Sequence, residues 1–460
     1  MRALSYRSRV GLLVLALQSG ACTQRHIGST GETSAQATTE VEFGSTAGEP
    51  GTPTGGLAST ALTVDPTTGL VGTAGSESTG VETTSGPGVS DCGEVMLASG
   101  RRFNCLNYTM IFGRQLAAAD FSGDGIEDLA VLEFSEIPMD VDRVHMIFGG
   151  TSPTPGAGFP VDVPSATDGV LLAGDLDGDA APDLVNAGYF SVHPLWNDGH
   201  GGFSDGASEP VVWLDKYTLA DVGGLGRMAL VGSMDDGEKP VIQVVGFDLE
   251  RNFVVAPATA PVVTCYPEAI VAARLDADPF PDLVVAPYCD PPLDATPVHV
   301  YRGTETAEFE LTEPGVLTGS APGVLAAGDY DGDGDMDIVV GNQWIDNLML
   351  LRGDGAGGFE PRPPIGMGAL GTPNTLATGD LGAPADSIVM IVVDPNAPVN
   401  HVAVVREPLS DEPTIEVLRS DAIPYIGRGG LAVGDFNGDA ADDIAYMLVD
   451  DTLVLLLSAP

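Results

Sequence analysis

The residues best suited to chemistry in this sequence are aspartates that recur in short acidic turns. Oxygen-bearing side chains stand at positions 1, 3, 5 and 9 of each turn, and position 7 can offer its backbone carbonyl. Hard oxygen ligands in a flexible turn suit Ca²⁺, which takes about six to eight oxygens, better than zinc or copper. The pattern predicts about four structural calcium sites, with the ligands Asp120, Ser122, Asp124, Ile126, Asp128, Asp175, Asp177, Asp179, Ala181, Asp183, Asp329, Asp331, Asp333, Asp335, Asp337, Asp435, Asn437, Asp439, Ala441 and Asp443.

Two other kinds of turn could account for these residues. An EF-hand loop starts alike, but it needs a bidentate Glu at position 12 and a helix on each side. Position 12 is Val131, Asn186, Val340 or Tyr446 here, and both flanks read as strands. Plain Asx turns between strands are the second alternative. Clustering three or four carboxylates without a cation costs electrostatic repulsion, so the repeated pattern favours calcium.

Three further turns keep the spacing but have lost part of the pattern. Around Asp221 and near Asp380 most ligand positions hold residues without a side-chain oxygen, and we predict no metal there. The remaining turn has Arg274 at position 1. We expect its guanidinium to replace the cation by pairing with the carboxylates at positions 3, 5 and 9, which are Asp276, Asp278 and Asp282.

The seven turns define an internal repeat. Their first positions are 120, 175, 221, 274, 329, 380 and 435, so successive steps run from 46 to 55 residues. Short apolar segments flank each turn, as at 325–328, 338–340 and 348–351, and helical periodicity is absent. A repeat of about 50 residues built from four short strands is typical of a β-propeller blade. The predicted fold class is all-β, a seven-bladed propeller over residues 91–460.

These turns, together with glycine turns that end in Phe such as Phe203 and Phe359, resemble the FG-GAP and VCBS repeat families. The families include the seven-bladed head of integrin α subunits. The resemblance covers about residues 91–460. It implies that the calcium turns lie on one face of the propeller and that a partner binds at the opposite rim.

The last repeat lacks its outermost strand before the chain stops at Pro460. An unassigned apolar run at 108–113 precedes the first repeat. We predict that this run pairs with the last blade, which would close the ring and leave no exposed edge.

The N-terminal segment is predicted to direct export. Residues 1–21 combine arginines, a short apolar run and small residues, which is typical of a signal peptide. Cys22 after small residues resembles the lipobox of bacterial lipoproteins, which implies acylation of Cys22; Ser19, where that family usually has Leu, would also suit ordinary signal peptidase. Residues 22–90 are rich in Thr, Gly, Ser and Pro and predict a disordered tether.

The remaining four cysteines predict two disulfides in an exported chain. Proximity in the sequence favours the pairs Cys92–Cys105 and Cys265–Cys289. A zinc site would need paired C-x-x-C spacing, which is absent.

Charge excludes some classes of partner. The 460 residues carry 19 Lys and Arg against 65 Asp and Glu, a formal charge of −46. Such a surface does not neutralise phosphates, so nucleic acid is excluded as a partner. A polybasic membrane surface is excluded as well, and we expect membrane attachment only through an N-terminal lipid anchor.

Catalytic motifs are not apparent in the sequence. Histidines 145, 193, 299 and 401 fall near the third strand of their repeats and read as partly solvated strand positions, and Trp196, Trp213 and Trp344 read as blade packing. We therefore expect a non-enzymatic calcium-binding module for adhesion or binding at the cell envelope, with an unidentified protein or glycan as partner. The alternatives are a propeller lyase or hydrolase that acts on an extracellular polysaccharide or lipid, and a purely structural envelope component.

Overall fold

The computed structural model describes residues 89–97, 100–108, 113–133, 141–155, 160–164, 169–211, 214–235, 240–256, 259–261, 266–288, 296–319, 321–343, 345–394, 399–421, 430–448 and 452–459. The chain divides into two units, Met1–Gly80 and Val81–Pro460, and every described residue lies in the second. The predicted signal peptide, Cys22, the tether up to residue 88 and the Cys265–Cys289 pair lie outside the described residues. In the part of the chain that is described, no helix has the length and apolarity needed to span a bilayer.

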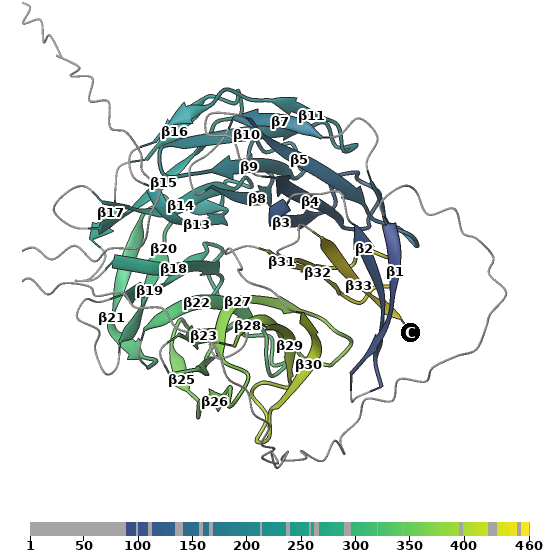
Figure 1. The fold of residues 1–460 in the computed structure, drawn as a ribbon. Coiled ribbons are helices and arrows are strands. Elements are labelled where there is room, and N and C mark those ends of the chain that lie inside the picture. Colours follow the sequence, from purple (N-terminus) through teal and green to yellow (C-terminus); the bar gives the residue numbers. More distant parts are fainter. Residues whose placement is uncertain are drawn as a thin grey trace, which may run out of the picture. The chain divides into compact units, whose positions relative to one another are not determined.

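Seven antiparallel sheets, numbered as blades 1–7, contain all of the described strands (Figure 1). Blade 1 comprises β3 (Gly113–Ala119), β4 (Asp128–Glu133), β5 (Val141–Phe148), β6 (Thr154–Pro155) and β7 (Val161–Pro164). Blade 2 comprises β8 (Val170–Gly174), β9 (Asp183–Ala187), β10 (Ser191–Asn197), β11 (Phe203–Asp205) and β12 (Glu209–Pro210). Blade 3 comprises β13 (Leu214–Ala220), the 3₁₀ helix η1 (Val222–Gly224), β14 (Ala229–Asp235), β15 (Pro240–Phe247), β16 (Phe253–Val255) and β17 (Thr259–Pro261).

Blades 4–6 follow the same plan. Blade 4 comprises β18 (Tyr266–Ala273), β19 (Asp282–Tyr288), β20 (Pro297–Gly303) and β21 (Phe309–Leu317). Blade 5 comprises β22 (Pro322–Gly328), β23 (Asp337–Asn342), β24 (Asn347–Gly353), β25 (Phe359–Pro361) and β26 (Ile365–Gly366). Blade 6 comprises β27 (Thr372–Gly379), β28 (Ser387–Val393), β29 (Asn400–Arg406) and β30 (Thr414–Asp421).

Blade 7 joins the two ends of the repeat array. It comprises β31 (Leu431–Gly434), β32 (Asp443–Met447) and β33 (Leu453–Ala459), followed by β2 (Arg102–Tyr108) and β1 (Val89–Met96). The first strands of successive blades contact one another around the ring, and β3 of blade 1 contacts β31 of blade 7. The predicted seven-bladed β-propeller is therefore confirmed.

Apolar clusters fill the seven interfaces between neighbouring blades. Val284 of β19 packs with Ile338 of β23 between blades 4 and 5, and Val131 of β4 packs with Leu455 of β33 where the ring closes. Because each blade is covered on both faces, every residue of β23 is buried. Burial of one such side chain contributes about 1.5–3 kcal/mol, so the stacked blades hold the acidic turns on rigid strands.

Ring closure by the N-terminal segment is confirmed, but the predicted strand was misplaced by about six residues. The strand that pairs with β33 is β2, in a register that sets Arg102 opposite Ala459 and Tyr108 opposite Leu453. Gly113 already begins the first strand of blade 1, and 109–112 lie outside the described residues. The run at 108–113 is the more hydrophobic segment. The strand that pairs is instead β2, in which buried and exposed side chains alternate at its start, and its Phe103 and Cys105 are buried in the interface with blade 6.

The predicted Cys92–Cys105 disulfide is confirmed. It joins β1 to β2 with a Cα–Cα distance of 5.0 Å. The disulfide therefore cross-links the β1–β2 hairpin that completes blade 7, and β2 is the strand that closes the ring by pairing with β33.

The histidines and one tryptophan lie largely as predicted. His145, His193, His299 and His401 are on the third strands β5, β10, β20 and β29. His193 and His299 are buried rather than partly solvated, because both faces of a blade are covered by its neighbours. Trp196 is buried against Phe247, with ring centroids 5.0 Å apart. The side chains of Trp213 and Trp344 lie outside the described residues.

Candidate metal centre

The first aspartate of each intact turn holds the turn closed. In blade 5, Asp329 Oδ1 accepts the backbone N–H groups of Gly332 (2.8 Å) and Asp333 (3.1 Å), and its Oδ2 accepts that of Gly334 (3.0 Å). The corresponding three bonds are made in blades 1, 2 and 7 by Asp120, Asp175 and Asp435. Position 1 thus organises the backbone of all four turns.

The carboxylate at position 9 ties each turn to the third strand of its blade. Asp337 accepts the N–H of Tyr330 (2.8 Å) and the N–H of Gly353 at the end of β24 (2.8 Å). Equivalent pairs of bonds are made by Asp128, Asp183, Asp282 and Asp443. Asp282 makes them in the turn that has Arg274 at position 1, so this position is structural even where no metal is expected.

Burial raises the pKa of these position 9 carboxyl groups. The pKa of Asp183 and of Asp443 rises to about 7, and that of Asp337 to about 6. Loss of solvent is the main cause, and carboxylates of the same turn raise the pKa further, while the two N–H bonds oppose the rise. A bound cation would offset the cost of ionising these groups at neutral pH.

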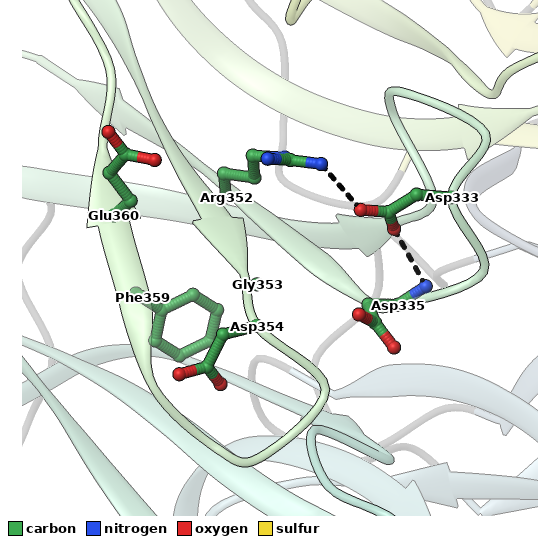
Figure 2. A pocket seen from close by; sticks show the side chains of 7 residues that line it. All are labelled: Asp333, Asp335, Arg352, Gly353, Asp354, Phe359 and Glu360. Carbon is green, nitrogen blue, oxygen red and sulfur yellow. Dashed lines mark hydrogen bonds and ion pairs between the residues drawn. The ribbon is translucent and has the colours of Figure 1, made fainter.

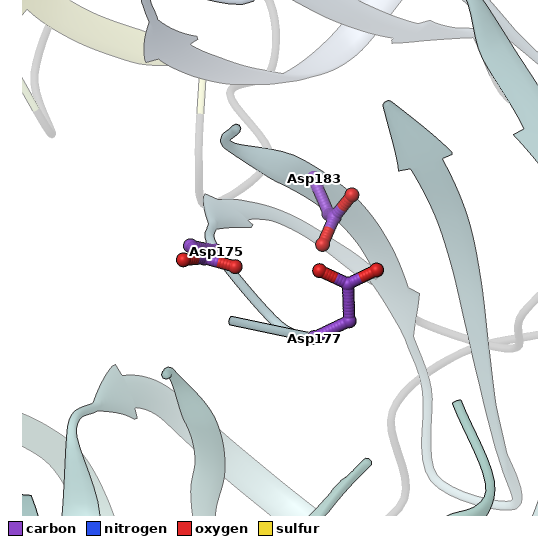
Figure 3. A group of neighbouring side chains, drawn as sticks. All are labelled: Asp175, Asp177 and Asp183. Carbon is purple, nitrogen blue, oxygen red and sulfur yellow. The ribbon is translucent and has the colours of Figure 1, made fainter. Parts of the chain in front are cut away.

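Two of the four intact turns bring three carboxylate oxygens close enough to share one cation. The oxygens of each group lie within 4.8 Å of one another, and the groups are Asp175, Asp177 and Asp183 in blade 2 (Figure 3) and Asp329, Asp331 and Asp333 in blade 5. Asp337 is not part of the blade 5 group. No such carboxylate group forms among the described residues of the turns at 120–128 and 435–443.

The turn of blade 7 is filled by protein donors instead. Ser458 Oγ donates to the carboxylate of Asp439 (2.9 Å) and contacts the carbonyl of Ala441 (3.2 Å). The side-chain amide of Asn437 donates to Asp443 Oδ1 (3.0 Å). Four of the predicted ligand residues are therefore engaged with one another or with Ser458.

The residues at position 7 donate their backbone N–H group to the side-chain carboxylate at position 5. In all four turns their N–H group bonds the position 5 carboxylate at 2.9–3.0 Å, and they are Ile126, Ala181, Asp335 and Ala441. In blade 1 the acceptor is Asp124, while the N–H of Ser122 at position 3 donates to Asp128 (2.8 Å).

Arginines lie on the carboxylates of both groups. Arg352 of β24 contacts Asp331 through Nε (2.5 Å) and Asp333 through a terminal nitrogen (2.6 Å). Arg352, Asp333 and Glu360 line a pocket of about 380 Å³ (Figure 2). In blade 2, Arg251 from the turn between β15 and β16 contacts Asp177 through Nε (2.6 Å). The sequence interpretation missed these arginines because neither lies in the turn that it contacts.

The predicted role of Arg274 is wrong. Arg274 is exposed and forms no ion pair with the carboxylates of its own turn. Instead Arg302, on β20, contacts Asp276 (3.0 Å). The physical reason is that a guanidinium only donates hydrogen bonds, so at position 1 it cannot accept the backbone N–H bonds that draw an aspartate into the turn.

The two most degenerate turns keep fragments of the same bonding. Asp221 Oδ1 accepts the N–H of Gly226 (2.9 Å) after the 3₁₀ helix η1, and Asp380 Oδ1 accepts that of Gly382 (2.8 Å). Neither turn contains a group of three converging carboxylates among the described residues. That they bind no metal remains a prediction.

Carboxylates directly before position 9 join neighbouring blades, a role that the sequence interpretation missed. In the shorter turn of blade 6, Ser387 takes the place of position 9, since it pairs with Gly379, and Asp386 precedes it. Asp386 accepts the N–H of Asp329 (2.9 Å) and returns its own N–H to the carbonyl of Asp329 (2.9 Å). Asp442 makes the same exchange with Asp380. Glu127 donates its N–H to Asp435 O (3.1 Å). The visible signal was an acid directly before position 9, as in Glu127 and Asp442.

The residues present fit a hard divalent cation best in blades 2 and 5. Each of these turns offers three convergent carboxylate oxygens on a backbone that position 1 has already curved. Blade 7 fits less well because a hydroxyl group and an amide N–H occupy its ligands. The structure thus separates four similar sequence motifs into two kinds of turn.

Comparison with known families supports the repeat assignment. FG-GAP-like repeats match residues 274–340 and 329–383, which run from the turn after β18 of blade 4 to the turn after β27 of blade 6. The chain therefore contains FG-GAP-like repeats within a seven-bladed propeller. A comparison with curated protein sequences finds no relative.

Solved structures give distant similarities only. An Agrocybe aegerita lectin, described as recognising non-reducing terminal N-acetylglucosamine, is 14% identical with a TM-score of 0.43, over 75% of this chain and 86% of the lectin. The V. cholerae biofilm matrix protein Bap1 is 10% identical with a TM-score of 0.38, over 77% of this chain and 89% of Bap1. The Pseudomonas aeruginosa periplasmic gluconolactonase PpgL is 11% identical with a TM-score of 0.43, over 72% of this chain and 95% of PpgL. None of these similarities bears on function.

Proposed function

We propose that this chain is an exported, calcium-binding β-propeller that acts as a non-catalytic binding or adhesion module at the cell envelope. The observation that carries the proposal is the convergence of three carboxylate oxygens within 4.8 Å in the turns of blades 2 and 5. Oxygen ligands on a flexible turn are those that calcium prefers. Nothing in these turns supplies the nitrogen or sulfur ligands that zinc and copper favour.

Calcium has a structural role in this proposal. In blade 2 a cation would neutralise Asp175, Asp177 and Asp183, the last of which is buried with a pKa raised to about 7. In blade 5 Asp329 also exchanges two hydrogen bonds with Asp386 of blade 6. A cation bound there would therefore stiffen both a turn and a contact between blades.

The placement of the titratable pairs supports a non-catalytic role. His193 pairs with Asp205 at 2.6 Å, but its side chain is only 2% exposed. His145 pairs with Glu133 at 2.7 Å, and both side chains are less than one fifth exposed. A general base must reach its substrate, and both imidazoles lie largely within the blades, whereas Asp205 is exposed on the edge strand β11.

Export is supported by the Cys92–Cys105 disulfide, because disulfides persist in oxidising compartments. We further propose that residues 1–21 are a signal peptide, that acylated Cys22 anchors the chain, and that residues 22–90 hold the propeller away from the membrane. The partner would be a protein or glycan outside the cell. Mass spectrometry of the mature N-terminus tests the anchor directly.

The calcium proposal is tested by thermal melting of the full chain with and without EDTA, together with metal analysis. At about 1 mM Ca²⁺, sites with a Kd of about 10⁻⁴–10⁻³ M would stabilise the fold by about 0.4–1.4 kcal/mol each. We expect chelation to lower the melting temperature and Ca²⁺ to restore it better than Mg²⁺. An unchanged melting curve in a metal-free protein would contradict calcium binding.

The binding role is tested separately with glycan arrays and with pull-downs from envelope extract. Specific retention of a glycan or envelope protein would support a binding module. Turnover of a polysaccharide or lipid substrate by the same preparation would favour an enzyme instead. Neither retention nor turnover would favour a purely structural envelope component.

A further inference from the structure

Each convergent carboxylate group is already neutralised in part by an arginine. Asp331 and Asp333 each bond a backbone N–H through Oδ1, while their Oδ2 atoms face Arg352. Asp177 is arranged in the same way: its Oδ1 accepts the backbone N–H of Asp179, and its Oδ2 accepts the Nε–H of Arg251. The oxygens left for a cation at these positions are therefore the ones that the guanidinium groups hold.

The two arginines reach the turns from different elements. Arg352 belongs to the third strand of its own blade, one residue after Leu351, which pairs with Ile338. The corresponding residue of blade 2 is Trp196, and there Arg251 arrives from blade 3 with its guanidinium carbon 4.8 Å from the centroid of the Trp196 ring. Two unrelated routes thus place a guanidinium on the same turn positions.

Arg251 also occupies a costly backbone position. Its φ is 64°, in the left-handed region, and the corresponding turn positions of blades 2 and 5 are Gly201 and Gly357, with φ of 75° and 82°. A non-glycine residue costs about 1 kcal/mol there. Gly357 faces Asp276 of the preceding blade, as Arg251 faces Asp177, so a side chain at this position can reach the neighbouring turn.

We infer that Arg251 and Arg352 compete with calcium: each closes its turn in the metal-free protein and moves off the carboxylates when the cation binds. The inference rests on the proposed calcium binding. A divalent cation and a guanidinium on the same oxygens repel each other, so binding requires the arginine to leave. The two residues thereby set the calcium affinity of their turns.

Calcium titration of the full chain by isothermal calorimetry tests the competition. Arg352→Gln and Arg251→Gln should each bind calcium about five- to tenfold more tightly at the altered turn, the scale of an ion pair worth about 1 kcal/mol. Arg352→Lys should fall between wild type and Arg352→Gln, because a lysine keeps the charge but cannot contact both carboxylates with a planar fork. Melting curves confirm that each variant is folded.

Two control variants distinguish the effect of direct arginine contact on calcium affinity from the effect of net charge. Arg227 packs beside Gly178 of the blade 2 turn but makes no ion pair with its carboxylates. Arg362 contacts Glu360 in blade 5 and makes no ion pair with the described carboxylates of the turn. Arg227→Gln and Arg362→Gln remove the same charge and should change calcium affinity by no more than about twofold, because screened charges interact weakly.

Trp196 provides a second readout that is specific to blade 2. Release of Arg251 from its ring should change tryptophan emission as calcium is added, since a cation near the ring alters its environment. Arg251→Gln should bind calcium by calorimetry but lose this response. Trp196→Phe, compared with wild type, shows which part of the signal comes from Trp196 among the 3 tryptophans.

The outcomes separate this inference from the proposed function. Equal calcium affinity in wild type and both glutamine variants would overturn the competition and leave calcium binding intact. Binding by the variants alone would support the competition and overturn calcium binding by the native turns. No binding by any of the proteins up to about 20 mM Ca²⁺, well above the weakest expected Kd, would overturn both.

Discussion

The turns of blades 5 and 7 share the aspartates at positions 1, 5 and 9 but have different interiors. Both are curved by an aspartate at position 1, Asp329 or Asp435, which accepts three backbone N–H groups. In blade 5 three carboxylates converge under Arg352. In blade 7 the hydroxyl group of Ser458 enters the turn.

Part of the difference is set on the third strand, in addition to Asn437, which replaces an aspartate at position 3 of the turn. Gly353 and Ser458 occupy the same place, since each donates its N–H to the position 9 aspartate of its blade. A glycine leaves the ligand oxygens to a cation or an arginine, whereas the serine side chain satisfies them from within the protein. Ligand positions alone therefore do not define a calcium site in this fold.

The largest expected effect concerns what both turns share. Asp337→Ala and Asp443→Ala each leave two backbone N–H groups without their acceptor, which costs about 3 kcal/mol or more of unfolding free energy. The loss should appear with or without calcium in denaturant titrations. Asp335→Ala is the control, because its position contributes a backbone N–H to the turn. A loss confined to calcium-loaded protein would mean that position 9 acts mainly as a metal ligand.

The pH dependence of the metal-free protein should be the next largest effect. The carboxyl groups of Asp183, Asp337 and Asp443 have pKa values raised from 3.8 to between about 6 and about 7. The folded state thus binds protons that the unfolded state has released, so stability is highest below pH 4 with respect to these groups and is lost as pH rises to about 7. The rise from 3.8 corresponds to about 3–4 kcal/mol for each group, so we expect a fall of several kcal/mol over this window in EDTA. Excess calcium should flatten the profile, and a metal-free profile that rises between pH 4 and 7 would contradict these pKa shifts.

Replacing the serine of blade 7 should make its turn resemble that of blade 5. Ser458→Ala frees the carboxylate of Asp439 and the carbonyl of Ala441. It should cost about 1 kcal/mol in the metal-free protein and increase the calcium bound in equilibrium dialysis. The exposed Ser204 of β11 serves as a control in Ser204→Ala. Unchanged calcium binding would show that Ser458 does not close the turn.

The smallest expected effect concerns position 6. This position is left-handed in every intact turn, and blades 2 and 7 carry Ala180 and Ala440 there, with φ of 73° and 65°. Ala180→Gly should stabilise the fold by about 0.5 kcal/mol in chemical denaturation, because relief of the left-handed alanine exceeds the entropy cost of glycine. Gly334→Ala should have the opposite sign, and equal signs would contradict the argument.

The blades could be predicted from the sequence because each acidic turn and its flanking strands are local. Features that depend on contacts between distant segments could not. Arg251 reaches Asp177 across a blade boundary, and nothing in the spacing pairs them. Arg274 was adjacent to the carboxylates in sequence, yet Arg302 reaches Asp276 from a neighbouring strand. The closing strand was also misplaced, because β-pairing register is decided by burial on both faces of β2.

The most direct test of the account is a crystal structure of the propeller grown with calcium, with anomalous data collected to identify the ions. The account predicts calcium on Asp175 and Asp177 in blade 2 and on Asp329 and Asp331 in blade 5, with Arg251 and Arg352 turned away from their carboxylates. Turns without calcium at saturating concentration, with both arginines still on the aspartates, would contradict it.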